Sequence, residues 1–134
     1  MKKIIHHENE MGELAKLFIE QLRPGMVVAL NGPLGAGKTS FVRHVFRALG
    51  YDAKVKSPTY TLVETYDING QHYCHFDLYR LHDPHELEFI GFREYIKSEN
   101  ICFIEWPKKA GGVLTKVDYC IEIDIIDDGR VVSW

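Results

Sequence analysis

The spacing of apolar residues along the first part of the chain predicts a buried strand between two helices. Residues 10–22 carry an apolar stripe at helical spacing, and Asn9 is the expected cap of this helix. Residues 26–30 are continuously apolar, as in a strand that is buried on both faces. A second helical stripe occupies residues 41–49, and Gly50 is its expected end.

The middle of the chain predicts a β-hairpin. Residues 60–68 and 71–79 are rich in β-branched and aromatic side chains, and they flank Asn69-Gly70, which is a strong short-range hairpin signal. Alternation along the second strand places one set of side chains in the core and the other on a shared, more polar face. The core set is Cys74, Phe76 and Leu78, and the polar set is Tyr73, His75, Asp77 and Tyr79.

After the hairpin, residues 84–98 predict a short helix or a pair of turns broken near Gly91. Residues 101–104 form another continuous apolar run, which indicates a further buried strand. A loop over residues 106–116 is expected to follow, because this segment contains a proline and a pair of glycines.

The two ends of the chain add short strands to this pattern. Ile4-Ile5 indicates a first strand, residues 119–126 alternate as a strand, and Asp128-Gly129 turns the chain into a last short strand. Helices that interleave with apolar strands favour an α/β fold. We therefore expect one three-layer domain over residues 1–134, with a mixed sheet, a β-hairpin insertion and antiparallel C-terminal strands.

Composition narrows the function classes. Hydrophobic residues make up 46% of the 134 residues, which excludes a disordered chain, and the net charge of -3 argues against broad electrostatic binding to nucleic acid. A contact with tRNA would have to be local or made by a partner. Cys74, Cys102 and Cys120 lack metal-ligand spacing, so we expect buried free thiols in a reducing cytoplasm. With neither a signal-peptide core nor a membrane-spanning apolar run, the sequence predicts a cytoplasmic protein without a membrane contact.

Residues 32–39 (GPLGAGKT) match the phosphate-binding loop pattern G-x-x-x-x-G-K-[ST], between the predicted strand and helix that this motif requires. The glycines let backbone N–H groups face the phosphates, Lys38 supplies a charge for the β- and γ-phosphates, and Thr39 offers a hydroxyl ligand for Mg²⁺. The expected nucleotide-binding residues are Gly32, Pro33, Leu34, Gly35, Ala36, Gly37, Lys38, Thr39 and Ser40.

Four residues outside the loop are further candidates. Glu105 ends an apolar strand, where a carboxylate would hold Mg²⁺ through water or orient the attacking water. Asp77 either positions a water molecule or contacts the ligands of a metal ion, or it is a charge on a solvated hairpin face. The pattern alone favours the solvated face. Thr59 is either a γ-phosphate sensor or part of an ordinary turn, which the pattern favours. Trp106 either stacks on a ligand or anchors its loop.

Several blocks together resemble the TsaE (YjeE) family, the bacterial ATPases needed to make threonylcarbamoyladenosine in tRNA. The phosphate-binding loop is generic. The segments 57–63 (SPTYTLV), 75–81 (HFDLYRL) and 104–107 (IEWP) make the match specific, and their order and spacing agree over most of the chain.

The resemblance implies a small P-loop ATPase that binds ATP with Mg²⁺, hydrolyses it slowly alone and is a monomer when free. It implies work with the TsaB and TsaD proteins, in which TsaD transfers the threonylcarbamoyl group to tRNA and ATP hydrolysis resets the complex between rounds. By similarity, Lys38 and Thr39 have phosphate and Mg²⁺ roles, and Glu105 has a Mg²⁺ or water role. Thr59 and Asp77 are then essential site positions, and Trp106 lies beside the nucleotide.

The chain departs from the family pattern at three places. Pro33 replaces a frequent Asp, which stiffens the loop, and Met11 replaces a usual Thr, which puts an adenine contact there in doubt. Many family members continue past the position of Trp134, so we expect a shortened C-terminal part that weakens partner docking or leaves a sheet edge open.

Two other functions use the same loop. A small-molecule or nucleoside kinase needs an acceptor pocket, a lid and clustered arginines, whereas the arginines here are separated and the chain is too short for a substantial lid. A non-catalytic adaptor would use ATP only to order the Thr59 loop for a partner. The chain has no Asn-Lys-x-Asp element of the GTPase type, which favours ATP over GTP.

Overall fold

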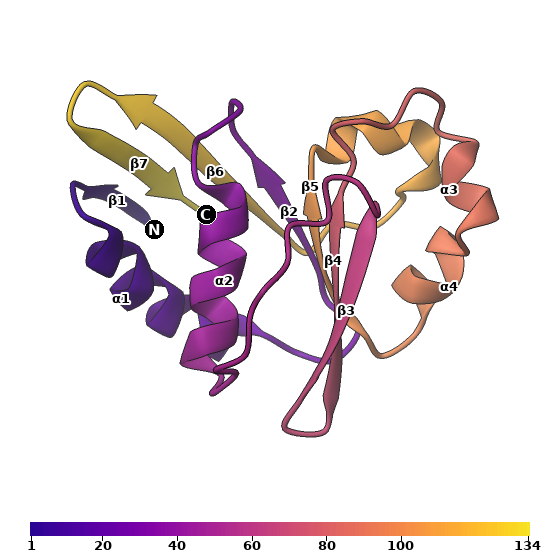
Figure 1. The fold of residues 1–134 in the computed structure, drawn as a ribbon, viewed down its shortest axis with the longest axis horizontal. Helices are drawn as coiled ribbons and strands as arrows, with labels where there is room; N and C mark the ends of the chain where they lie inside the picture. The colour runs from indigo at the N-terminus through magenta and orange to yellow at the C-terminus, as the bar shows by residue number, and fades with distance from the viewer.

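A seven-stranded sheet forms the middle layer of the protein (Figure 1). The computed structural model describes residues 1–134, and the strand order is β1-β7-β6-β2-β5-β4-β3. The strands are β1 Lys2–Ile5, β2 Val27–Asn31, β3 Val63–Ile68, β4 Gln71–Asp77, β5 Ile101–Glu105, β6 Tyr119–Ile126 and β7 Gly129–Ser133. The α-helices are α1 Glu8–Phe18, α2 Lys38–Ala48, α3 Glu86–Phe89 and α4 Phe92–Lys97, and the 3₁₀ helices are η1 Ile19–Gln21 and η2 Pro107–Val113.

The centre of the sheet is parallel and both edges are antiparallel. β2 runs parallel to β5 and β6, and β4 runs parallel to β5. The β3–β4 hairpin closes one edge, and β6, β7 and β1 form an antiparallel group at the other. This confirms the mixed sheet with a hairpin and antiparallel C-terminal strands. The carboxyl ends of β2, β4 and β5 lie at one edge, so the residues that follow these strands meet there.

Helices cover both faces of the sheet, with α1 and α2 on one side and α3 and α4 on the other (Figure 1). The first core contains Phe46 of α2, whose ring centroid lies 5.9 Å from that of Phe103 in β5. The second contains Phe92 of α4, whose ring centroid lies 5.0 Å from that of Phe76 in β4. Strands β4 and β5 therefore bury side chains in both directions, which explains the unbroken apolar run over residues 101–104.

The hairpin turn at Asn69-Gly70 is confirmed, because Ile68 pairs directly with Gln71 and both turn residues have positive φ. The first hairpin strand is shorter than predicted and begins at Val63. Residues 60–62 instead form a turn in which the Leu62 N–H donates to the Pro58 carbonyl over 2.8 Å. A local turn thus takes residues whose composition alone favours a strand.

The first helix begins at Glu8 rather than near residue 10, and the expected cap at Asn9 is wrong. The Glu10 carboxylate accepts the backbone N–H groups of both His6 and His7, each over 2.9 Å. This side chain satisfies donors at the start of the helix, so the helix starts earlier and Asn9 lies within its first turn.

Burial corrects two further predictions. β4 has no solvated polar face, because His75 and Asp77 are both buried beneath the surrounding segments. Cys74 and Cys102 are buried free thiols as predicted, whereas Cys120 on β6 is exposed. Cys120 alternates with Ile121 and Ile123, which β6 packs against the core, so its side chain lies on the opposite, exposed face.

The short elements around Gly91 are confirmed as α3 and α4. The segment over residues 106–116, predicted as a loop, contains the 3₁₀ helix η2, which buries Pro107 and Ala110. No helix in the structure has the length and apolar content needed to span a bilayer.

Candidate functional site

The glycine loop after β2 has the backbone shape that its sequence predicts. Gly32, Gly35 and Gly37 all have positive φ, and Gly37 lies directly before the first residue of α2. A Cβ atom on Gly32 would lie 2.4 Å from the carbonyl oxygen of Ile123 in β6, so only glycine fits this close approach. The loop therefore turns tightly onto the sheet and directs the amino end of α2 toward the cavity beside it.

Four polar or charged side chains are buried in this protein, and all of them belong to this one region. They are Lys38, His75, Asp77 and Glu105. They come from α2, β4 and β5, which are far apart in sequence but meet at the carboxyl edge of the sheet. Burying such groups is unfavourable unless they are paired, so their concentration in one place is typical of a functional site.

The Lys38 ammonium is held between the loop and an aromatic ring. It donates to the carbonyl of Gly32 over 2.6 Å and to that of Pro33 over 3.0 Å. It also lies 4.2 Å from the ring centroid of Trp106, within the range of a cation–π contact. Burial lowers the pKa of Lys38, while the negative charges of Glu105 and Asp77 oppose that shift.

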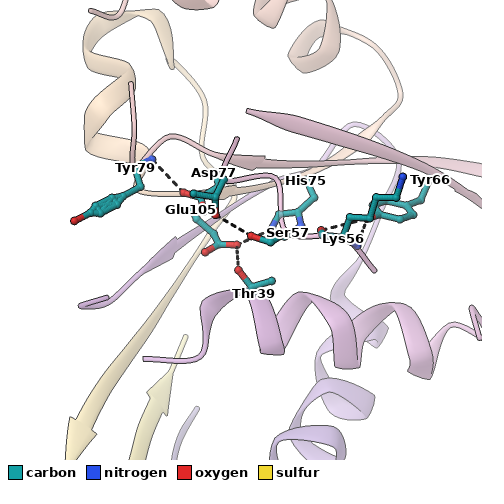
Figure 2. A network of polar contacts seen from close by, with 9 residues as sticks. Thr39, Lys56, Ser57, Tyr66, His75, Asp77, Tyr79 and Glu105 are labelled. Atoms are coloured by element: carbon teal, nitrogen blue, oxygen red, sulfur yellow. Dashed lines mark hydrogen bonds and ion pairs between the residues drawn. The ribbon is translucent and has the colours of Figure 1, made fainter. Parts of the chain in front are cut away.

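Glu105 links the loop to the centre of the sheet. The Thr39 hydroxyl donates to Oε2 of Glu105 over 2.8 Å, and Nε2 of His75 lies 2.6 Å from the same oxygen. Figure 2 shows these three side chains converging from α2, β5 and β4. The structure thus places Glu105 beside Thr39, at the carboxyl end of β5 where the sequence expected a carboxylate.

Asp77 and Thr59 form a second polar pair next to Glu105. The Thr59 hydroxyl donates to Oδ2 of Asp77 over 3.0 Å and lies 2.8 Å from the Ser57 hydroxyl. Oδ1 of Asp77 accepts the backbone N–H of Tyr79 over 3.1 Å. Because Asp77 pairs with Glu105 in the sheet register, the two carboxylates occupy neighbouring strand ends. This arrangement replaces the solvated hairpin face that the pattern favoured.

Trp106 has a left-handed backbone, with φ 59° and ψ 52°, which is rare for a bulky residue. Its ring lies between Lys38 and Tyr79, and the Tyr79 ring centroid is 5.0 Å away. Strain of this kind persists where the surroundings enforce it, and it is common at ligand sites. Trp106 both anchors its loop and presents a ring to the site.

Two cavities meet along the glycine loop. One has a volume of about 260 Å³ and is lined by Lys38, Thr39, Thr59, Asp77, Glu105 and Trp106. The other, of about 300 Å³, is lined by residues before and within α1, including Met11, and by Arg130 of β7. Both are bordered by Gly35, Ala36, Gly37 and Ser40, so a single elongated ligand lying over the loop can reach from one cavity into the other.

The second cavity contains residues that the sequence analysis missed. The Arg130 guanidinium donates to the carbonyls of Ala36 over 3.0 Å and Gly35 over 3.4 Å. The Glu8 carboxylate accepts from Ser40 and lies 2.9 Å from Nε2 of His44. These contacts, with Ser40 first and His44 second, lower the pKa of Glu8. No local motif marks either residue, because both act on the loop from distant segments.

Comparison with known proteins assigns the chain to a family. The family model described as Threonylcarbamoyl adenosine biosynthesis protein TsaE matches residues 5–132. The chain belongs to the TsaE family. Proteins of this family are involved in tRNA threonylcarbamoyladenosine biosynthesis.

Individual TsaE proteins agree with this assignment. The chain is 50% identical over 120 residues to the tRNA threonylcarbamoyladenosine biosynthesis protein TsaE of Haemophilus influenzae, covering 90% of this chain and 74% of the relative. The Bacillus subtilis protein of the same name is 38% identical over 97 residues, which cover 72% of this chain and 60% of the relative. The crystal structure of Bacillus subtilis YdiB superposes with a TM-score of 0.81 at 28% identity, covering 98% of this chain and 82% of that one.

Proposed function

We propose that this chain binds ATP with Mg²⁺ and hydrolyses it in support of threonylcarbamoyladenosine formation in tRNA. The proposal rests on one observation. All the buried polar and charged side chains gather beside a phosphate-binding loop, and three of them line the same cavity. Family membership supports the biosynthetic context, and the geometry of the site supports the chemistry.

The order of residues along the loop gives the nucleotide a direction. Lys38 serves the β- and γ-phosphates in the P-loop pattern, so the triphosphate end belongs in the cavity that Lys38 and Glu105 line. The nucleoside then extends over Gly37 and Ser40 into the cavity beside Met11 and Arg130. Phosphate oxygens would take over the Lys38 contacts that the loop carbonyls now make.

The residues present fit a magnesium ion. Mg²⁺ prefers hard oxygen ligands, and the Thr39 hydroxyl and Glu105 carboxylate place two such groups 2.8 Å apart beside the cavity. These two side chains would hold the ion together with phosphate oxygens. When bound, Mg²⁺ neutralises negative charge that builds up on the phosphates during hydrolysis.

Asp77 and Thr59 are assigned to the attacking water. Oδ2 of Asp77 accepts a hydrogen bond from the Thr59 hydroxyl, and both residues line the cavity in which we place the triphosphate. Asp77 would orient the water and accept its proton, while Thr59 would respond to the γ-phosphate. Attack at the γ-phosphorus breaks the bond to the bridging oxygen and releases ADP and phosphate.

The proposed setting is the one that the family resemblance implies. The free chain is a monomer and a slow ATPase, TsaB and TsaD activate it, and tRNA is reached through that complex. The proposed compartment is the cytoplasm. Cys74 and Cys102 are paired in the sheet register and yet remain free thiols, which suits a reducing environment.

The test measures ATP hydrolysis by the purified chain, alone and with the TsaB–TsaD pair. We expect a low basal rate that the pair raises strongly, and loss of both rates in Glu105→Ala. Glu99→Ala is the matched control, because Glu99 is exposed just before β5. Tight ATP binding without any hydrolysis would contradict the proposal. Full multi-turnover tRNA modification with a non-hydrolysable ATP analogue would instead support the adaptor function.

A further inference from the structure

His75 lies in the middle of β4, between Glu64 of β3 and Phe103 of β5 in the sheet register, and it is fully buried. Its two ring nitrogens have different surroundings. Nε2 lies 2.6 Å from Oε2 of Glu105, whereas Nδ1 is buried and has no hydrogen-bond partner. Almost every buried polar atom in a folded protein has a partner, so this unpaired nitrogen requires an explanation.

The contacts determine which nitrogen carries the proton. A carboxylate accepts hydrogen bonds, so the contact with Glu105 places a hydrogen on Nε2 of His75. A hydrogen on Nδ1 would have no acceptor, because that atom has no hydrogen-bond partner in the protein. The tautomer with hydrogen on Nε2 therefore makes the hydrogen bond to Glu105, and it leaves Nδ1 as an acceptor without a partner.

This tautomer makes His75 one of two donors that converge on a single carboxylate oxygen. The Thr39 hydroxyl, at the start of α2, donates to the same Oε2 over 2.8 Å. Oε1 of Glu105 makes no hydrogen bond within the protein, and the residue lines the cavity beside Lys38. One oxygen of Glu105 is thus fixed by the protein and the other is left for a ligand.

We propose that His75 is a positioning residue that holds Glu105 in the orientation needed for Mg²⁺. This inference rests on the proposed function, because it concerns the side chain that contacts Glu105, a proposed ligand of the same ion. A free glutamate side chain has several rotatable bonds and loses that freedom when it binds a cation. Two donors on Oε2 restrict the side chain in advance, so Mg²⁺ binding loses less entropy. Thr39 keeps oxygen lone pairs for the ion while its hydroxyl hydrogen is donated in the hydrogen bond to Glu105.

The main test compares His75→Leu, which removes the donor at similar volume, with His75→Gln, whose amide retains one. We measure the Mg²⁺ concentration that half-saturates ATP binding, and ATP binding in EDTA as a separate quantity. For His75→Leu we expect the Mg²⁺ requirement to rise about 10- to 100-fold. ATP binding in EDTA should stay unchanged in His75→Leu. His75→Gln should require nearly as little Mg²⁺ as the wild-type chain. His72→Leu is the matched control, with the same substitution in the same strand at a more exposed position.

A double-mutant cycle separates positioning from a general structural role. If His75 acts through Glu105, His75→Leu adds no further loss of Mg²⁺ affinity once Glu105 is replaced by alanine. Additive losses would overturn the proposal, because they would mean that His75 affects the ion independently. An unchanged Mg²⁺ requirement in His75→Leu would also overturn it.

Nitrogen NMR of the wild-type chain tests the same idea without any substitution, in case the buried variants fail to fold. We expect the His75 ring with hydrogen on Nε2 and a shift of that signal when Mg²⁺ is added to the ATP-bound chain. A ring with hydrogen on Nδ1, or a signal that ignores Mg²⁺, would overturn the inference. A wild-type chain that binds ATP equally with and without Mg²⁺ would overturn the proposed ion site itself, which distinguishes the two failures.

Discussion

The two ends of the glycine loop, where we propose that the triphosphate and the nucleoside of ATP lie, are built in different ways. At the triphosphate end, Lys38, Asp77 and Glu105 are buried and are held by neighbouring strands and the start of α2. At the proposed nucleoside end, Glu8 comes from the start of α1 and Arg130 from β7, and both remain partly in contact with solvent. The first end is enclosed by two cores, whereas the second borders the antiparallel edge of the sheet.

This difference suggests that one end of the loop determines ATP hydrolysis and the other contributes to nucleotide affinity. Charges that are excluded from water interact strongly and stay in place, which is what phosphate chemistry requires. Side chains that are partly hydrated contribute weaker and more adjustable contacts. We therefore expect substitutions at the triphosphate end to affect hydrolysis strongly, and substitutions at the nucleoside end to affect nucleotide affinity or stability moderately.

The largest effect is expected for Lys38→Ala. Lys38 is the buried cation of the site, so its loss should reduce ATP hydrolysis by about 100-fold or more, because no other group replaces its charge at the phosphates. Phosphate release measures the loss of hydrolysis, and a separate nucleotide-binding measurement shows how far ATP affinity changes. Lys109→Ala is the matched control, since Lys109 is exposed on η2. Normal tRNA modification by the Lys38 variant would contradict the assigned role.

Asp77→Asn should separate hydrolysis from binding. The amide keeps the shape and the Thr59 contact but cannot take a proton, so we expect the turnover rate to fall about 100-fold with little change in ATP affinity. Single-turnover hydrolysis and equilibrium binding distinguish the two quantities. Asp124→Asn, on an exposed position of β6, is the control. A loss of affinity without a loss of turnover would move Asp77 out of the catalytic role.

Arg130→Ala addresses the nucleoside end. Its guanidinium holds the carbonyls of Gly35 and Ala36, so its loss should loosen the loop and weaken nucleotide affinity roughly tenfold. Turnover at saturating ATP should change much less. Arg47→Ala, exposed on α2, is the matched control. If turnover falls more than affinity, the proposed division between the two ends of the loop is wrong.

Glu8→Gln should have the smallest effect, on stability and its pH dependence. Hydrogen bonds from Ser40 and His44 lower the pKa of Glu8, so the folded state favours the ionised carboxylate. This stabilisation is complete above the ordinary carboxyl pKa of about 4.3 and disappears as pH falls through the lower folded-state pKa. The mostly exposed side chain limits it to under about 1 kcal/mol. Urea unfolding of both proteins from pH 7 to pH 3 should show the difference shrinking toward zero, and a constant difference would contradict this origin.

Local signals predicted much of the fold. The continuous runs in β2 and β5 identified buried strands, and Asn69-Gly70 identified the hairpin turn, because both depend on nearby residues. Errors occurred where a nearby side chain or turn competed with the pattern. Glu10 moved the start of α1, and a turn shortened β3 before Val63.

Site residues that belong to a short sequence motif could be predicted, whereas those that depend on contacts between distant segments could not. The loop motif identified Lys38 and Thr39. Glu105 was identified as a candidate because it directly follows an apolar strand. The Asp77 pattern favoured solvent, because alternation in one strand cannot show that segments from elsewhere cover its polar face. The sequence placed His75 on that polar face and at the start of the 75–81 block, and neither pattern indicated its contact with Glu105.

By itself, the sequence determined the phosphate-binding loop, the strands and helix that present it, and the family, because these depend on residue type and short spacing. Only the tertiary structure decided which polar groups are buried together. Thr39 and Glu105 are 66 positions apart, and Arg130 and Ala36 are 94 apart, so they meet only because the sheet register and the packing of the loop and α2 on the sheet bring them into contact. Register follows from the packing of whole strands against two cores, and that is a property of the complete chain rather than of any one segment.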